Sequence, residues 1–206
     1  MSEPLDLIKI LARDFKAPDG TVVKALSLDA EKRAAEQTGS ARLEVQIKAL
    51  EGGVTPIRYT RNIGTLGAAG QIALLKSHVA VIGAGGTGCT VIELLARAGI
   101  GKLTVIDPDS FTEDNLNRQG FANENRLGWN KAEVAAEAVE YINSAVSVQV
   151  YRERLVAENA SDLLKKADLV VDCVDNIPSR FIIQKAAANN NIPLVSAAVG
   201  GFGGFV

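Results

Sequence analysis

Short apolar runs alternate with longer amphipathic segments from residue 78 onward. The apolar runs predict buried strands, and the segments between them predict helices. Because strands that alternate with helices form parallel sheets covered on both faces, we expect an α/β fold. Within that fold we expect a doubly wound, mostly parallel, Rossmann-like sheet with helices on both faces and a ligand at the carboxyl ends of the strands. Strands are expected over 79–82, 103–107, 146–151, 169–172 and 194–197, and helices over 86–98, 130–142, 159–166 and 178–190.

Turn and cap residues support these boundaries. Gly99 and Gly101 follow the first helix of this region and are expected to end it. Asn130 is the expected N-cap of the next helix, and Pro178 suits the first turn of the last one. A long polar connection is expected over 109–129.

The first 57 residues follow a different pattern, and we expect them to form a small N-terminal helical appendage before a ligand-binding domain over 58–206. Asp19-Gly20 is a turn signal before a strand expected over 21–28. Residues 199–206 favour a further strand or hairpin, and the final apolar Phe-Val indicates a domain that is incomplete at its C-terminal end. Helices of the appendage are expected over 3–15, 30–37 and 41–51.

Composition excludes several classes of protein. The chain has 206 residues, of which 47% are hydrophobic and 22% charged, as in soluble globular proteins. Its net charge of −2 gives no support to general nucleic-acid binding or to a membrane-surface role. No apolar run approaches the roughly 20 residues that a bilayer span needs. The acidic first twenty residues do not resemble a signal peptide, so we expect a cytoplasmic protein.

The two cysteines and the single histidine limit the possible chemistry. Two cysteines without a Cys-x-x-Cys pair exclude a four-cysteine zinc site within this chain. Cys89 lies at an expected helix start, where a thiolate would be favoured, but we expect Cys89 and Cys173 to be packing residues. His78 marks the start of a strand and has no histidine partner, so a metal site or a Ser/His/Asp triad is not expected.

The segment Gly83-Ala-Gly-Gly-Thr-Gly88 follows a buried strand and opens a helix, as in nucleotide-binding proteins. Free N–H groups and the helix dipole at such a turn favour a phosphate, and a Cβ would block its close approach. Asp107 ends the next strand, at the place of a ribose-binding carboxylate; the alternative is a turn residue. Dehydrogenases and methyltransferases share such a motif, so it does not by itself decide the function.

Three cations and one carboxylate accompany this glycine segment. Arg61, Arg118 and Lys131 would suit the charge of a triphosphate, although surface cations are more often simply solvated. Asp175 follows the fourth strand and would suit Mg²⁺, with Asp172 as the competing carboxylate. Together these groups point to attack on the α-phosphate with loss of pyrophosphate. A carboxylate nucleophile is already ionised at pH 7, so the reaction would need no general base.

Six segments resemble, in order, the adenylating domain of the ThiF/MoeB/HesA family, relatives of ubiquitin-activating enzymes. The resemblance covers roughly residues 58–206. The segments are Arg58-Tyr-Thr-Arg61, Gly83-Ala-Gly-Gly-Thr-Gly88, Asp107-Pro-Asp109, Asn115-Leu-Asn-Arg118-Gln119, Gly128-Trp-Asn-Lys131 and Asp172-Cys-Val-Asp-Asn176 with Arg180.

The resemblance implies a site for ATP and Mg²⁺. Asp107 would hold the ribose hydroxyls, Lys131 would bind phosphate near the scissile bond, and Asp175 would hold Mg²⁺. Arg118 would contact the triphosphate, and Arg61 would reach into the site of the other subunit of a homodimer. The remaining implied nucleotide-binding residues are Gly83, Gly85, Gly86, Gly88, Asn115, Gln119 and Asn176.

The resemblance also implies the reaction. Family members adenylate the C-terminal glycine of a small ubiquitin-like sulfur-carrier protein ending in Gly-Gly, as in thiamine or molybdopterin biosynthesis. The chain lacks the cysteine pairs for the zinc that many members carry. A relative that adenylates a small carboxylate on a tRNA base is a second hypothesis. An NAD-dependent oxidoreductase would leave Arg118, Lys131 and Asp175 without a function, and a non-catalytic nucleotide-binding protein is the last alternative.

Overall fold

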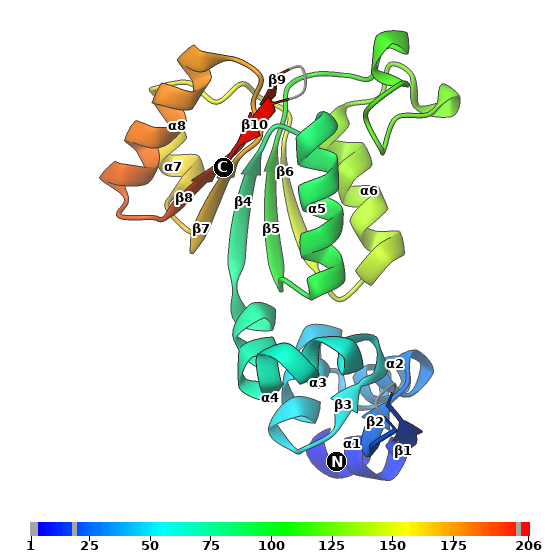
Figure 1. Ribbon diagram of the computed structural model, residues 1–206. Coiled ribbons are helices and arrows are strands. Elements are labelled where there is room, and N and C mark those ends of the chain that lie inside the picture. Colours follow the sequence, from blue (N-terminus) through cyan, green and yellow to red (C-terminus); the bar gives the residue numbers. More distant parts are fainter. Residues whose placement is uncertain (1–3, 18–19, 201–202) are drawn as a thin grey trace. The chain divides into compact units, whose positions relative to one another are not determined.

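The computed structural model describes residues 4–17, 20–200 and 203–206. The chain divides into two compact units, Met1–Lys76 and Ser77–Val206, each with its own helices and sheet (Figure 1). The boundary expected at residues 57 and 58 falls inside the first unit, and as a functional boundary it stays a prediction. In the described part of the chain, no helix is long and apolar enough to cross a membrane.

The second unit is built on a parallel sheet with the strand order β6-β5-β4-β7-β8 among the described residues. The chain runs outward from β4 to β6 and then crosses to β7 on the other side of β4, so the strand order reverses between β4 and β7. Ligands of doubly wound sheets bind at such a switch point. The strands are β4 (His78–Ile82), β5 (Lys102–Ile106), β6 (Ser147–Tyr151), β7 (Leu169–Asp172) and β8 (Leu194–Ser196).

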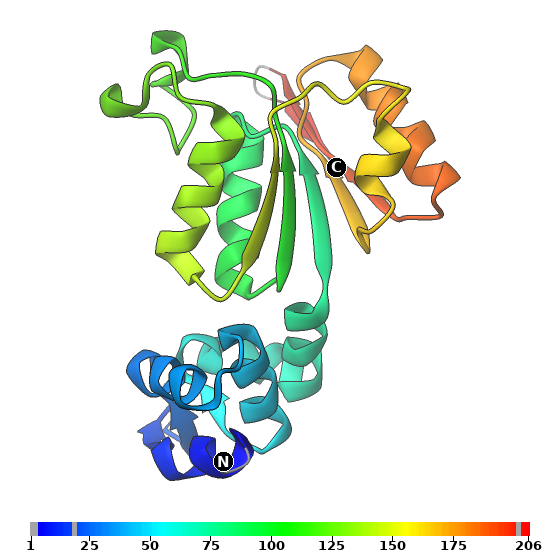
Figure 2. The same cartoon turned by 180° about the vertical axis from the view of Figure 1, so that it is seen from behind.

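Helices cover both faces of this sheet, which confirms the predicted architecture (Figures 1 and 2). Alternate strand residues point to opposite faces, so Ala80 and Ile82 join one core with α7 and α8, whereas Val79 and Val81 face the other layer. The first layer is α5 (Gly86–Ala98) and α6 (Lys131–Asn143), and the second is α7 (Ala160–Leu164) and α8 (Ile177–Asn189).

The predicted elements of the second unit are all found, with ends that differ by at most two residues. Gly99 caps α5 in the left-handed conformation with φ 88°, and the Asn130 side chain caps α6, as expected. The polar connection contains two 3₁₀ turns, η2 (Glu113–Asn115) and η3 (Glu124–Arg126). The expected final hairpin is present as the antiparallel pair β9 (Ala198–Gly200) and β10 (Gly203–Phe205). Residues 201–202 lie outside the described residues.

The first unit is not purely helical, which corrects part of the sequence prediction. The helix expected over 3–15 ends at Leu11, and β1 follows it because Arg13 and Phe15 pair with Ala25 and Val23 of β2. The strand expected over 21–28 is confirmed as β2. The elements are α1 (Pro4–Leu11), β1 (Arg13–Lys16), β2 (Val22–Leu26), α2 (Leu28–Thr38), α3 (Arg42–Glu51), β3 (Thr55–Pro56), η1 (Ile57–Tyr59) and α4 (Thr60–Lys76).

A buried polar group helps to hold the first unit together. Glu31 of α2 is 1% exposed and accepts hydrogen bonds from Arg42 and Gln46 of α3. The Tyr59 hydroxyl donates to Gln46 Oε1 over 3.2 Å. A buried carboxylate needs such partners, so this network fixes α2 and α3 against the segment that leads into α4.

Candidate nucleotide-binding site

Gly83, in the turn after β4, and Gly88, in the first turn of α5, are required by the packing of the protein itself. Gly83 has φ 94°, and a Cβ there would lie 2.8 Å from the carbonyl oxygen of Cys173. A Cβ on Gly88 would collide with the carbonyl oxygen of Gly83. The turn after β4 therefore contacts the turn after β7 directly, at the switch point of the sheet.

Gly85 and Gly86 are different, because the protein leaves room beside them. The nearest atom to a Cβ on Gly85 would be Gln119 Nε2 at 3.7 Å, and the nearest to one on Gly86 would be the Arg118 carbonyl oxygen at 3.7 Å. Both are ordinary contact distances. Since packing does not require glycine at these two positions, they fit a surface that a ligand approaches closely.

Asp107 is buried and holds the glycine turn in place. Its Oδ2 accepts the N–H of Ala84 over 2.7 Å, and its Oδ1 accepts the N–H of Asp109 over 2.8 Å. Burial raises the pKa of Asp107, while these two hydrogen bonds and nearby Lys131 oppose that rise. The turn role is confirmed; the ribose role of Asp107 stays a prediction.

Asn130 joins the Asp107 turn to the start of α6. Its Nδ2 donates to the carbonyl oxygens of Asp107 and Asp109 over 3.1 and 3.0 Å, and its Oδ1 accepts the N–H groups of Ala132 and Glu133. These bonds place the next residue, Lys131, at the same edge of the sheet.

Lys131 is unlike a solvated surface lysine. Its side chain is 11% exposed, and its Nζ lies 3.5 Å from Asp109 Oδ2. The ammonium is also close enough to Asp107 to oppose the rise of that carboxyl's pKa. The sequence-predicted Lys131 and Asp107 are therefore brought together at one end of the sheet.

The polar connection carries Arg118 and Gln119 to the glycine turn. The Arg118 guanidinium is half-exposed and lies 3.8 Å from Asp114 Oδ2. Gln119 is 6% exposed, and its Oε1 is buried without a hydrogen-bond partner among the described residues. A buried unsatisfied amide oxygen costs free energy. Together with the space beside Gly85, it indicates that this site is built for a further polar group.

Asn115 has local partners instead. It is 4% exposed, its Oδ1 accepts the N–H of Thr112 over 3.3 Å, and its Nδ2 donates to Asp114 Oδ2 over 3.0 Å. These bonds shape the turn before Arg118. A contact of Asn115 with a nucleotide stays a prediction.

Both cysteines pack as expected. Cys89 Sγ accepts the N–H of Gly120 over 3.1 Å and donates to the Gly86 carbonyl oxygen over 3.2 Å, which ties the first turn of α5 to the polar connection. Burial raises the pKa of the Cys173 thiol to about 12, so a reactive thiolate is disfavoured there.

The two competing acids after β7 have separate environments. Asp172 is 1% exposed and is bonded to Arg180 and Ser196 over 3.0 and 2.7 Å. Asp175 is exposed, and within the described ranges it forms no ion pair. Asn176 lies beside it, and its Oδ1 caps α8 through the N–H of Ser179. Asp175 is therefore the carboxylate that is open to a metal.

Arg180 is the residue that sequence reasoning left without a role. Its guanidinium donates to Asp172, to Ser196 and to the carbonyl oxygens of Val174 and Ala197. Its place eight residues after a buried strand-end acid was the available signal. That spacing does not reveal the ion pair, because the two residues meet through the β7–α8 turn.

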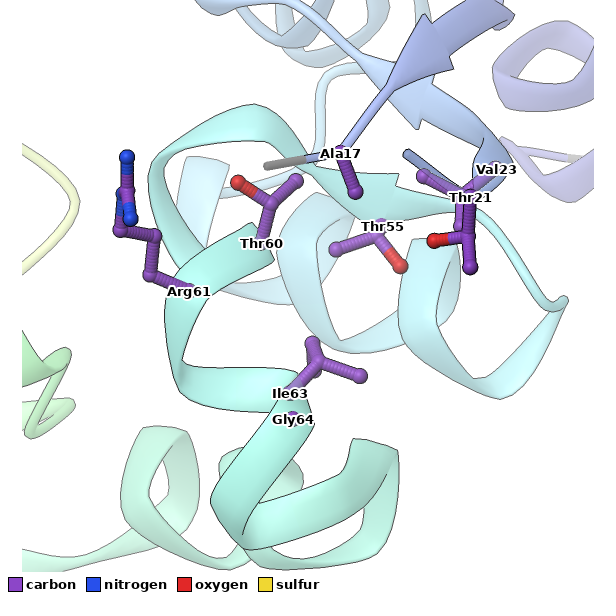
Figure 3. A pocket seen from close by; sticks show the side chains of 8 residues that line it. All are labelled: Ala17, Thr21, Val23, Thr55, Thr60, Arg61, Ile63 and Gly64. Atoms are coloured by element: carbon purple, nitrogen blue, oxygen red, sulfur yellow. The ribbon is translucent and has the colours of Figure 1, made fainter. Parts of the chain in front are cut away.

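Arg61 belongs to the first compact unit, so its position is described within that unit alone. It lies on α4 and lines a cavity of about 360 Å³. In Figure 3 its side chain extends away from Thr55 and Ile63, on the far side of Thr60. The structure thus brings the backbone at Arg118, the neighbouring Asp107 and Lys131, and the turn before Asp175 to the Gly83–Gly88 segment. The nucleotide contacts of these residues and the role of Arg61 stay predictions. The cavity is lined by Ala17, Thr21, Val23, Thr55, Thr60, Arg61, Ile63 and Gly64.

Comparison with known proteins finds a matching protein family and several related sequences. A profile of the ThiF family matches residues 59–206. Adenylyltransferase and sulfurtransferase MOCS3 of Xenopus laevis is 40% identical over 144 residues, which are 69% of this chain and 32% of that protein. The sulfur carrier protein adenylyltransferase of Thermus thermophilus is 38% identical over 151 residues, which are 72% of this chain and 56% of that protein. The chain spans about a third of the first relative and about half of the second.

Solved structures give the same fold. The tRNA N6-threonylcarbamoyladenosine dehydratase TcdA of E. coli, in complex with ATP, superimposes with a TM-score of 0.66 at 31% sequence identity. The similarity covers 68% of this chain and 58% of that chain. Another structure of the same enzyme holds AMP. The doubly wound fold is therefore confirmed by similarity as well as by topology.

Proposed function

Because this chain belongs to the ThiF family, we propose that it is an ATP-dependent adenylyltransferase of the cytoplasm. Its substrate is the C-terminal glycine carboxylate of a small ubiquitin-like sulfur-carrier protein ending in Gly-Gly. The relative from Thermus thermophilus, a sulfur carrier protein adenylyltransferase, supports this substrate class. The active form is a homodimer in which Arg61 of one subunit serves the site of the other.

One observation carries the proposal: three separate segments with charged side chains surround the same glycine turn. The Arg118 carbonyl lies beside Gly86, Asp107 links Lys131 to the turn, and the segment before Asp175 packs on Gly83. A dinucleotide site does not need two cations and an exposed carboxylate there. A triphosphate with its metal does, because its charge is larger.

The residues of the site suit each part of the transfer. The N–H groups at the start of α5 and the space beside Gly85 and Gly86 receive the phosphates. Lys131 and Arg118 neutralise the negative charge that grows on the leaving pyrophosphate. Asp175 would hold Mg²⁺, which would supply further neutralisation of that charge.

The chemistry needs no protein base. An oxygen of the glycine carboxylate forms a bond to the α-phosphorus while the bond from that phosphorus to the bridging oxygen breaks. Pyrophosphate leaves with the electron pair, and the acyl-adenylate remains. Because the nucleophile is ionised at pH 7, the reaction does not require the single histidine, His78, as a base.

Carrier-dependent exchange of pyrophosphate into ATP tests the proposal. We predict that Lys131→Ala and Asp175→Asn each lower the exchange rate by about 10²–10³-fold, as loss of one charge-stabilising group does. Lys165→Ala is the matched control, because Lys165 is half-exposed and pairs with Asp162 on α7. Circular dichroism should show that all three variants are folded. Exchange at the wild-type rate in both site variants would refute the assignment.

A second candidate is adenylation of a small carboxylate on a tRNA base, favoured by the structural similarity to TcdA. It shares the nucleotide chemistry and differs in the carboxylate. AMP release should then be stimulated by tRNA and not by a Gly-Gly carrier protein. The net charge of −2 favours the carrier protein over tRNA.

A further inference from the structure

Three side chains form a clamp at the carboxyl ends of β7 and β8. Asp172 and Ser196 are neighbours in the parallel ladder, and Ser196 Oγ donates to Asp172 Oδ2 over 2.7 Å. Arg180 of α8 donates through Nη1 to both, over 3.0 Å to Asp172 and 2.8 Å to Ser196. The clamp therefore joins two strands and the helix that follows the Asp175 turn.

The clamp also holds the backbone immediately before Asp175. The N–H of Val174 donates to Asp172 Oδ1 over 3.0 Å, and its carbonyl oxygen accepts from Arg180 Nη2 over 2.6 Å. Both backbone polar groups of Val174 are thus fixed by the two members of one ion pair. The Asp175 carboxylate stays exposed, beside Asn176 Nδ2 at 3.4 Å.

The four acceptors require the shape of a guanidinium. Nη1 and Nη2 reach two side chains and the carbonyl oxygens of Val174 and Ala197, the last over 3.0 Å. A lysine ammonium is a point charge and does not present such a planar fork. Buried ion pairs seldom stabilise a fold more than apolar residues of the same size would. Four directed bonds around one turn are better explained by the geometry that they impose.

We propose that Arg180 is a positioning residue for the metal–nucleotide complex: it fixes the turn over 173–176 so that the Asp175 carboxylate faces Mg²⁺. This inference rests on the proposed function, in which Asp175 is the metal ligand. Arg180 itself touches neither nucleotide nor metal. Residues that orient a metal ligand typically change metal affinity by about 10–100-fold when they are replaced.

The test is direct binding of ATP to the purified full chain, measured by calorimetry once in excess EDTA and once in MgCl₂. The ratio of the two dissociation constants is the Mg²⁺-dependent gain in affinity. We expect Arg180→Lys to reduce this gain by about 10-fold or more. Affinity for ATP in EDTA should stay within about two-fold of the wild type, because the Gly85 and Lys131 side of the site is untouched.

A double-mutant cycle assigns the effect to Asp175. Asp175→Asn should remove the Mg²⁺-dependent gain, and Arg180→Lys should cause no further loss when the two substitutions are combined. Arg97→Lys is the matched control, because Arg97 forms an exposed ion pair with Glu93 on α5. If Arg180→Lys does not fold, Ser196→Ala removes one partner from Asp172 and from Arg180 and should reduce the gain partially.

The outcomes are distinct. The positioning role is overturned if Asp175→Asn loses the Mg²⁺-dependent gain in ATP affinity while Arg180→Lys, or Ser196→Ala in its place, keeps the full gain. That outcome leaves the proposed function standing. Equal weakening of ATP binding with and without Mg²⁺ also overturns the positioning role, since that pattern marks general structural damage. A wild-type chain with no Mg²⁺-dependent gain overturns both proposals together.

Discussion

At the scale of single residues, the glycine turn separates packing from ligand binding. We predict that Gly88→Ala lowers the free energy of unfolding by about 1–3 kcal/mol, because its Cβ would collide with the Gly83 carbonyl. Gly85→Ala should leave stability within about 0.5 kcal/mol and weaken ATP binding instead, since its Cβ would occupy ligand space. Urea unfolding and calorimetric titration with ATP measure the two effects. Equal destabilisation by both substitutions would show that the whole turn serves packing.

Residue types and order predicted which segments meet at the carboxyl ends of the strands, but not which contacts each side chain makes there. Asp172 and Asp175 are identical in type and three positions apart. The structure distinguishes them because Asp172 is buried and forms an ion pair with Arg180, whereas Asp175 is exposed. Arg180 was visible in a family-like segment, yet its role depends on Ser196 and Ala197, which are near it only in three dimensions. Contacts between distant residues of this kind are not encoded in a local pattern.

At the scale of elements, local signals predicted the second unit well and β1 poorly. The strands β4, β5, β7 and β8 are mostly apolar, and β6 alternates polar and apolar residues. Asn130 and Gly99 mark helix ends through their own hydrogen bonds or backbone conformation. β1, in contrast, is mostly exposed and is a strand because it pairs with β2. A polar segment after a helix gives no local sign of that pairing. The sequence pattern therefore predicted a helix that continues to residue 15, whereas α1 ends at Leu11.

The start of β4 is joined to its neighbours by His78. Its Nδ1 lies 2.7 Å from the Lys166 carbonyl oxygen, which can only accept, so Nδ1 carries the proton. Its Nε2 lies 2.8 Å from Thr104 Oγ1 of β5. Burial is the main cause that lowers the pKa of His78 in the folded chain.

This lowered pKa predicts the pH dependence of stability. The unfolded chain binds more protons than the folded one in the pH range between the two pKa values of His78. The contribution is therefore fully present above the unfolded pKa of about 6.5 and is lost as pH falls through the folded value. We expect the urea midpoint to fall between pH 7.5 and 5.5, and to fall less in His78→Gln. Because His78 is the single histidine, an unchanged slope in that variant would contradict the assignment.

At the scale of the whole molecule, the identity of the nucleotide is the most decisive question. The glycine turn and Asp107 would suit ATP or NAD, whereas Arg118, Lys131 and Asp175 suit ATP with Mg²⁺. A ligand at 100 times its dissociation constant stabilises the folded state by about 2.7 kcal/mol, which corresponds to roughly 5–10 °C in melting temperature. ATP with MgCl₂ should produce a shift of this size, and NAD at the same concentration should not.

The intrinsic fluorescence of the chain can report the same binding independently. Trp129 is the single tryptophan, it is 55% exposed, and it lies between Gly128 and the Asn130–Lys131 start of α6. Binding of a triphosphate beside Lys131 is expected to change its emission, and Lys131→Ala should abolish that change while leaving the unliganded spectrum unaltered. A larger response to NAD than to ATP, in fluorescence and in melting temperature, would contradict an adenylating site and favour an oxidoreductase, because only the glycine turn and Asp107 would then be in use.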